Sequence, residues 1–166
     1  MNLLLAFIED RRLGLGAMGG LAIIAGSAMA WLYVPQPLIG TAIGYGVQDE
    51  GKITLLLGAL ALGTLIAWAR VRGRDLALAA AACGLAAAGI AGWYATRSAE
   101  NAARVLARAF TSGGAPLDPD AIVPFPARIG GGVWVVVAGA AVLVISSVAL
   151  SLRGAGTSAP AFRSSS

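Results

Sequence analysis

Four long runs without a charged residue constrain this chain more than any other feature of its sequence. Each run has roughly 17 to 25 residues, the length that an α-helix needs to cross a hydrocarbon core of ~30 Å. Apolar and polar residues do not alternate in these runs, which excludes the strands of a membrane barrel. The sequence therefore predicts an all-α fold, an integral membrane four-helix bundle, with spans at Leu13–Val34, Ile53–Ala69, Leu76–Thr96 and Ile129–Leu152.

The composition leaves no soluble alternative. Of the 166 residues, 58% are hydrophobic and 12% are charged, about half the charge density of a typical soluble chain. A soluble domain of this size has too little interior to hide so many apolar side chains. We expect a membrane domain over residues 1–152 with the lipid bilayer as its first partner. The tail, residues 153–166, is small, polar and aperiodic, and we expect it to be disordered.

The distribution of arginine predicts the orientation of the spans. Short cytoplasmic loops carry an excess of basic residues in membrane proteins. Basic residues are concentrated before the first run, between the second and third, and after the fourth: Arg11, Arg12, Arg70, Arg72, Arg74, Arg153 and Arg163. Both termini are therefore expected in the cytoplasm, with the cell membrane of a bacterium as the location. The net charge of +4 follows from the same rule, and no basic run interleaved with aromatic residues indicates nucleic acid as a partner.

The first run also allows a competing interpretation as a secretory signal peptide. Two arginines precede it, and Ala28–Ala30 imitates an A-x-A cleavage site. However, the apolar run continues to Val34, which is long for a signal peptide, and Glu9 and Asp10 interrupt the basic leading region. An uncleaved membrane anchor is the preferred interpretation.

Two connections are expected on the outer side of the membrane. The first, Pro35–Lys52, is rich in Gly and Pro and should fold back along the membrane rim. The second covers residues 97–128. Its first part repeats apolar residues at helical spacing, which predicts an amphipathic outer helix between spans 3 and 4, with Glu100 and Arg104 paired one turn apart.

Three arginines on this predicted outer helix, Arg97, Arg104 and Arg108, are the candidate contact residues. They could form a surface that docks a partner or an anion. Alternatively, their side chains could reach lipid headgroup phosphates from an interfacial helix, a common behaviour of arginine.

The sequence indicates no catalytic, metal or cofactor site. It contains no His and a single Cys, which excludes zinc sites and Cys/His nucleophile pairs within the chain. Asp118 and Asp120 lie in a Pro-broken stretch and are best interpreted as a solvated turn. The runs hold no Asp, Glu, Lys or Arg, although proton relays and coupled transport need such groups at membrane depth. We therefore expect a protein that is not an enzyme.

Small residues recur at four-residue spacing within the runs, a pattern typical of closely packed membrane helices. The longest such stripe lies in the third run and consists of Ala80, Gly84, Ala88 and Gly92. It predicts a helix-packing face, either at the centre of the bundle or against another protein.

One stretch carries a resemblance. Between Trp31 and Leu62, a Trp and a Pro close the first run, a Gly-rich connection follows, and Asp-Glu-Gly-Lys-Ile-Thr-Leu-Leu-Leu-Gly opens the second. This resembles small four-span membrane proteins of actinobacteria, including a conserved membrane protein encoded near tryptophan-biosynthesis genes. The resemblance implies four spans and no activity. Our leading interpretation is an accessory or scaffold subunit of a larger membrane complex, and the alternative is a self-associating, holin-like permeation protein.

Overall fold

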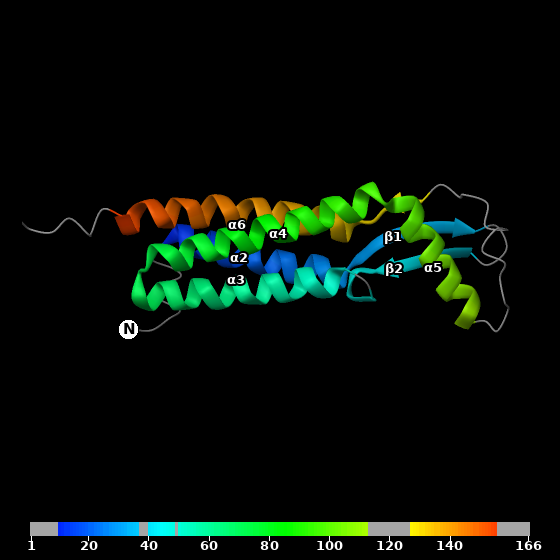
Figure 1. Cartoon of the computed structure of the whole chain (residues 1–166), viewed down its shortest axis with the longest axis horizontal. Helices are drawn as coiled ribbons and strands as arrows, with labels where there is room; N and C mark the ends of the chain where they lie inside the picture. Colours follow the sequence, from blue (N-terminus) through cyan, green and yellow to red (C-terminus); the bar gives the residue numbers. More distant parts are fainter. Residues whose placement is uncertain (1–9, 37–39, 49, 113–126, 156–166) are drawn as a thin grey trace, which may run out of the picture.

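The computed structural model describes residues 10–36, 40–48, 50–112 and 127–155. In this part of the chain, four helices lie side by side along the long axis, and a small sheet with another helix lies at one end (Figure 1). The long helices are α2 (Arg11–Ala28), α3 (Gly51–Val71), α4 (Arg74–Thr96) and α6 (Gly131–Ala155). Because α2 and α4 each pack against both α3 and α6, the helices form a closed ring in cross-section.

Among the described helices, three are long and apolar enough to cross a membrane: Gly51–Val71, Arg74–Thr96 and Gly131–Leu152 of α6. They coincide with the second, third and fourth predicted runs. They expose large apolar side chains along their length, including Leu60 of α3, Leu85 of α4 and Ile145 of α6. A mainly helical membrane protein is the class that these features support.

The first predicted span, Leu13–Val34, is wrong at its C-terminal end, because α2 ends at Ala28. The carbonyl of Gly26 accepts hydrogen bonds from the Met29 amide at 3.2 Å and from the Trp31 indole at 2.8 Å, which satisfies one of the carbonyls that the end of the helix leaves free. The residues that follow are aromatic or branched and lead to Pro35, which disfavours helix in the residue before it.

The end of the apolar run is a strand, so the prediction of an all-α chain is also corrected. Strand β1 (Ala30–Gln36) pairs antiparallel with β2 (Gly40–Tyr45) on one side and with β3 (Arg128–Ile129) on the other. The second strand of this hairpin lies within the connection Pro35–Lys52, and the hairpin extends beyond the ends of the long helices (Figure 1). A short 3-10 helix, η1 (Gly46–Gln48), connects β2 toward α3.

Helix α5 (Ser98–Ser112) is the amphipathic helix of the described chain, and it turns away from α4 to cross the hairpin (Figure 1). The chain bends at Arg97, where the side chain of Asn101 donates to the Tyr94 carbonyl at 3.1 Å and satisfies a terminal carbonyl of α4. Against β2, the absence of a side chain at Gly44 is required, since a Cβ there would lie 2.8 Å from Val105. The buried residues of α5 are Asn101, Ala102, Val105 and Leu106.

The two ends of the molecule differ in charge and structure. We call the end with the hairpin and α5 the sheet end. At the opposite, arginine end lie Arg11, Arg12, Arg70, Arg72 and Arg74 (Figure 1). There the Arg12 guanidinium donates to the Ala149 carbonyl of α6 at 3.1 Å. Arg72 closes α3 in the left-handed conformation, with φ 57°, and its guanidinium lies 5.0 Å from the centre of the Trp68 ring.

Candidate functional site

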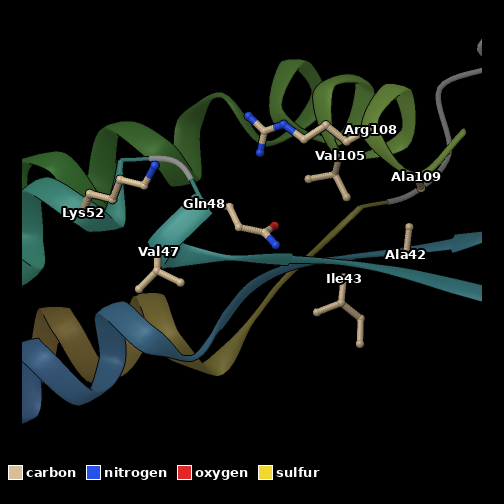
Figure 2. A pocket seen from close by; sticks show the side chains of 8 residues that line it. All are labelled: Ala42, Ile43, Val47, Gln48, Lys52, Val105, Arg108 and Ala109. Atoms are coloured by element: carbon tan, nitrogen blue, oxygen red, sulfur yellow. The ribbon is translucent and has the colours of Figure 1, made fainter. Parts of the chain in front are cut away.

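A hollow of about 600 Å³ lies at the sheet end, between α5, the second strand of the hairpin and the start of α3. Figure 2 shows its lining side chains. Their character is mixed, with an apolar wall interrupted by an amide and two cations. The lining residues are Ala42, Ile43, Val47, Gln48, Lys52, Val105, Arg108 and Ala109.

The polar lining comes from three different elements. Gln48 ends η1, Lys52 lies in the first turn of α3, and Arg108 lies on α5 one turn after the buried Val105. In Figure 2 the guanidinium of Arg108 and the amide of Gln48 reach into the space between α5 and the hairpin. The bend at Arg97 and the crossing of α5 over β2 therefore bring Arg108 to the same hollow as Lys52.

Arg97, the first of the three predicted contact arginines, is directed elsewhere. Its guanidinium stacks over the Trp93 ring at 4.1 Å from the ring centre and lies 3.6 Å from the Glu100 carboxylate. Because both contacts are made within the bend between α4 and α5, they stabilise that bend. An exposed ion pair of this kind contributes only ~0–1 kcal/mol.

Arg104 is paired with Glu50, the residue directly before α3, rather than with the predicted partner on its own helix. Its guanidinium lies 3.5 Å from the carboxylate of Glu50, while Glu100 pairs with Arg97. The predicted Glu100–Arg104 pair is therefore wrong. The crossing of α5 over the hairpin brings Arg104 to the start of α3, which sequence spacing within one helix does not show.

The three arginines therefore do not form one surface, and only Arg108 lines the hollow. Its cationic neighbour there, Lys52, was not among the predicted contact residues. Lys52 is the one lysine of the chain, placed directly before the second apolar run, and that position could have suggested a role at the membrane surface.

The predicted packing stripe of α4 is divided by the structure. Ala80 and Gly84 are both buried, and a Cβ on Gly84 would lie 2.9 Å from Val144 and 3.3 Å from the Ala140 carbonyl of α6. Ala88 is half-buried. At Gly92, a Cβ would meet no described atom within 4 Å, so this residue makes no close helix contact in the described chain.

A close contact between helix backbones joins α2 and α6, away from the stripe that was predicted as the main packing face. A Cβ at Gly19 would lie 2.7 Å from the Gly139 carbonyl oxygen, and one at Gly139 would lie 2.8 Å from the Gly19 carbonyl oxygen. Gly26 and Gly132 form a second contact of this kind, nearer the sheet end. A Cβ at Gly26 would lie 2.9 Å from the Gly132 carbonyl oxygen, and one at Gly132 would lie 2.7 Å from the Gly26 carbonyl oxygen. Backbone atoms cannot move aside, so these glycines set how closely α2 and α6 approach.

A second group of small residues faces outward, on α3. Here a shallow apolar groove of about 380 Å³ runs along α3 beside the start of α4, and its floor is Ala59, Gly63 and Ala67. A Cβ at Gly63 would meet no described atom within 4 Å. This surface, the α3 groove, is lined by Leu56, Ala59, Leu60, Gly63, Thr64, Ala67 and Leu76.

Over the described residues, no three His, Cys, Asp or Glu side chains gather where they could hold a metal ion. The predicted solvated turn at Asp118 and Asp120 lies outside the described residues. Comparison with family models, curated proteins and solved structures gives no match for this chain.

Proposed function

We propose that this chain is a four-span, non-catalytic membrane protein that acts as an accessory or scaffold subunit of a larger membrane complex. The single observation that carries the proposal is the α3 groove, an outward-facing row of small residues that no described helix of the chain covers. Small residues let the backbone of a second helix approach closely, and such packing drives the association of helices in lipid.

The assignment of four spans includes α2, which is shorter than the other long helices. Its 18 residues extend about 27 Å at 1.5 Å per residue, close to the thickness of the hydrocarbon core. It packs against α3 and α6, and it exposes Leu15, Met18 and Leu21. This placement favours a retained anchor over a cleaved signal peptide. The arginine end would face the cytoplasm of a bacterial cell, following the positive-inside rule.

The small residues elsewhere in the helices support a role for the α3 groove in binding another protein. On α2, Gly19 and Gly26 contact α6, and on α4 Gly84 does so as well. These residues are used for packing within the chain. Gly63 belongs to a similar row of small residues, but no described helix packs against it. We therefore propose that a transmembrane helix of a partner subunit packs in the α3 groove.

The alternative, a holin-like permeation protein built from copies of this chain, receives less support from the same surfaces. A pore needs polar groups on the face that copies would direct to its axis. The hydroxyls of Ser27, Thr54 and Ser147 are buried between the described helices. Self-association through the α3 groove would nevertheless give a different mass from a hetero-complex, which makes the alternative testable.

The test compares two glycines that are both open in the described chain. The full chain is extracted from its native membrane in mild detergent, and its associated proteins are identified by mass. Gly63→Leu should reduce association about tenfold or more, because overpacking an interface costs roughly 1–3 kcal/mol. Gly89→Leu is the control, since a Cβ at Gly89 also meets no described atom within 4 Å.

Equal thermal stability of both variants would show that Gly63→Leu acts on association and not on folding. A chain that is recovered alone, or association that Gly63→Leu leaves unchanged, would contradict the accessory proposal. A symmetric assembly of this chain only would favour the permeation alternative.

A further inference from the structure

We propose that the partner helix in the α3 groove carries an acidic residue at the arginine end, where its carboxylate pairs with Arg70. This inference rests on the proposed function, because it describes the partner of the same groove. Three observations carry it: where the groove ends, the place of Arg70 on α3, and the charge of the turn that follows.

The α3 groove reaches the arginine end of the molecule. Ala67, which belongs to its floor, lies near the end of α3, and Leu76, which also lines it, lies in the first turn of α4. A helix that packs along the floor therefore leaves the groove beside the turn that joins α3 to α4.

Arg70 lies on the face of α3 that forms the groove. It follows Gly63 by seven residues, and seven steps around a helix of 3.6 residues per turn return to within about 20° of the starting direction. Arg70 is exposed, and its side chain makes no ion pair, hydrogen bond or ring contact with another described residue. The groove thus ends in a cation that the described chain leaves unpaired.

The neighbouring arginines of the turn are placed differently. The guanidinium of Arg72 lies 5.0 Å from the centre of the Trp68 ring. Arg74 is the first residue of α4 and precedes Leu76 by two positions, which is about 200° around the helix. Arg74 is therefore directed away from the face by which Leu76 lines the groove, and Arg70 is the cation that a helix in the groove would meet.

The charge of the turn favours an acid on the partner. Arg70, Arg72 and Arg74 stand against one acid of the turn, Asp75, which is exposed. Because Arg70 is in the last turn of a helix that is apolar enough to cross a membrane, a carboxylate at its level lies at the membrane surface. It can remain ionised there without the cost of a charge at membrane depth.

The same charge disfavours a second copy of this chain as the occupant. Copies of one chain insert in the same orientation, so a symmetric contact through the α3 groove would bring the two copies of Arg70 to the same level. Like charges repel at such a contact, whereas an acid on a different helix would attract.

The experiment uses three synthetic transmembrane peptides as probes. Each has about 20 residues of Leu and Ala with one central Gly, enough to span the hydrocarbon core, and they differ only in one flanking residue, which is Glu, Gln or Lys. Binding of the labelled peptides to the purified full chain is measured by fluorescence in mild detergent, where a peptide can enter the groove in either direction. The Glu peptide should bind up to about fivefold more tightly than the Gln peptide, as for one exposed ion pair, and the Lys peptide should bind least.

Variants of Arg70 test the pair. Arg70→Gln should remove the preference for the Glu peptide, Arg70→Lys should keep it, and Arg70→Glu should reverse it in favour of the Lys peptide. The control is Arg74→Gln, which removes the same charge from the same turn and should keep the preference. Thermal unfolding verifies that each variant is folded, since a cation in the last turn of α3 also complements the helix dipole.

Gly63→Leu separates this inference from the proposed function. Should the three peptides bind equally to the unmodified chain and Gly63→Leu weaken all of them, the groove accepts a helix but the acidic partner is wrong. Should Gly63→Leu leave their binding unchanged, the groove is not where a helix binds, and the proposed function fails with it. Loss of the preference in Arg74→Gln would indicate attraction to the whole arginine end and overturn the pairing with Arg70.

Discussion

The hydroxyl oxygens of Ser27 and Thr54 lie 2.7 Å apart where the end of α2 meets the start of α3. Ser27 also contacts the Ile23 carbonyl at 2.7 Å, and Thr54 contacts the Gly51 carbonyl at 3.0 Å. Two hydroxyl protons thus serve three contacts, so the pair cannot donate fully to all of them at once. The two hydroxyls form a small shared network within the buried contact between the helices.

Because each hydroxyl has its own carbonyl to bond, removing either one leaves the other satisfied. We expect Ser27→Ala and Thr54→Val each to lower the free energy of unfolding by about 1 kcal/mol. In the double variant the two losses should not add, because the interaction between the hydroxyls is removed only once. Unfolding of the four chains of this cycle in detergent measures the coupling, and strictly additive losses would show that the hydroxyls act separately.

The contact between α2 and α6 should tolerate no added methyl group. Gly19→Ala and Gly139→Ala each place a Cβ less than 3 Å from a backbone carbonyl oxygen, and we expect losses of about 1–3 kcal/mol. Gly89→Ala, which is open on α4, should instead be neutral or stabilising by up to ~1 kcal/mol, since alanine favours helix. Thermal unfolding ranks the variants, and equal effects at all three positions would contradict the close approach of α2 and α6.

The two glycines of the predicted α4 stripe should respond differently to the same substitution. Gly84→Leu directs a large side chain at Val144 and the backbone of α6, so it should destabilise the fold. Gly92→Leu should be tolerated, because a Cβ there meets no described atom within 4 Å. The conservative Leu78→Ile, at a side chain that is 42% exposed, should cost under about 1.5 kcal/mol. Detergent thermal stability at equal expression separates these outcomes.

The proposed orientation predicts opposite accessibility at the two ends of the molecule. In a Cys83→Ser background, a cysteine at Ala103 on the exposed side of α5 should react with an impermeant thiol reagent in intact cells. A cysteine at Gly73, in the turn between α3 and α4, should react only after the membrane is opened. The reverse pattern would place the arginine end outside the cell.

The long helices could be predicted because their signal is local. An uncharged run of sufficient length has few alternatives to a helix in lipid, and α3, α4 and α6 follow this rule. The first run departs from this rule. Its last residues, including Trp31 and Val34, are as apolar as the helix before them but form a strand. Hydropathy over a window of about 20 residues does not distinguish a helix from a helix followed by a buried strand.

The candidate sites were less predictable, because they depend on geometry between elements. Residues spaced four apart are displaced by about 40° per step around a helix of 3.6 residues per turn. Gly92 therefore does not lie on the face of α4 by which Gly84 contacts α6. Lys52 and Arg108 line the same hollow only because the chain bends at Arg97 and α5 crosses the hairpin. No periodicity in the sequence encodes that crossing.

The glycine contact between α2 and α6 has a consequence for the order of biogenesis. Chains emerge from the ribosome N-terminus first, so α2 is made long before α6, the helix that contains Gly132 and Gly139. Until then α2 can dock only on α3, and the face that includes Gly19 and Gly26 remains without its final neighbour. The first described helix is therefore complete before its closely packed neighbour exists, and a nascent chain stopped before Gly131 would lack the helix that closes the ring.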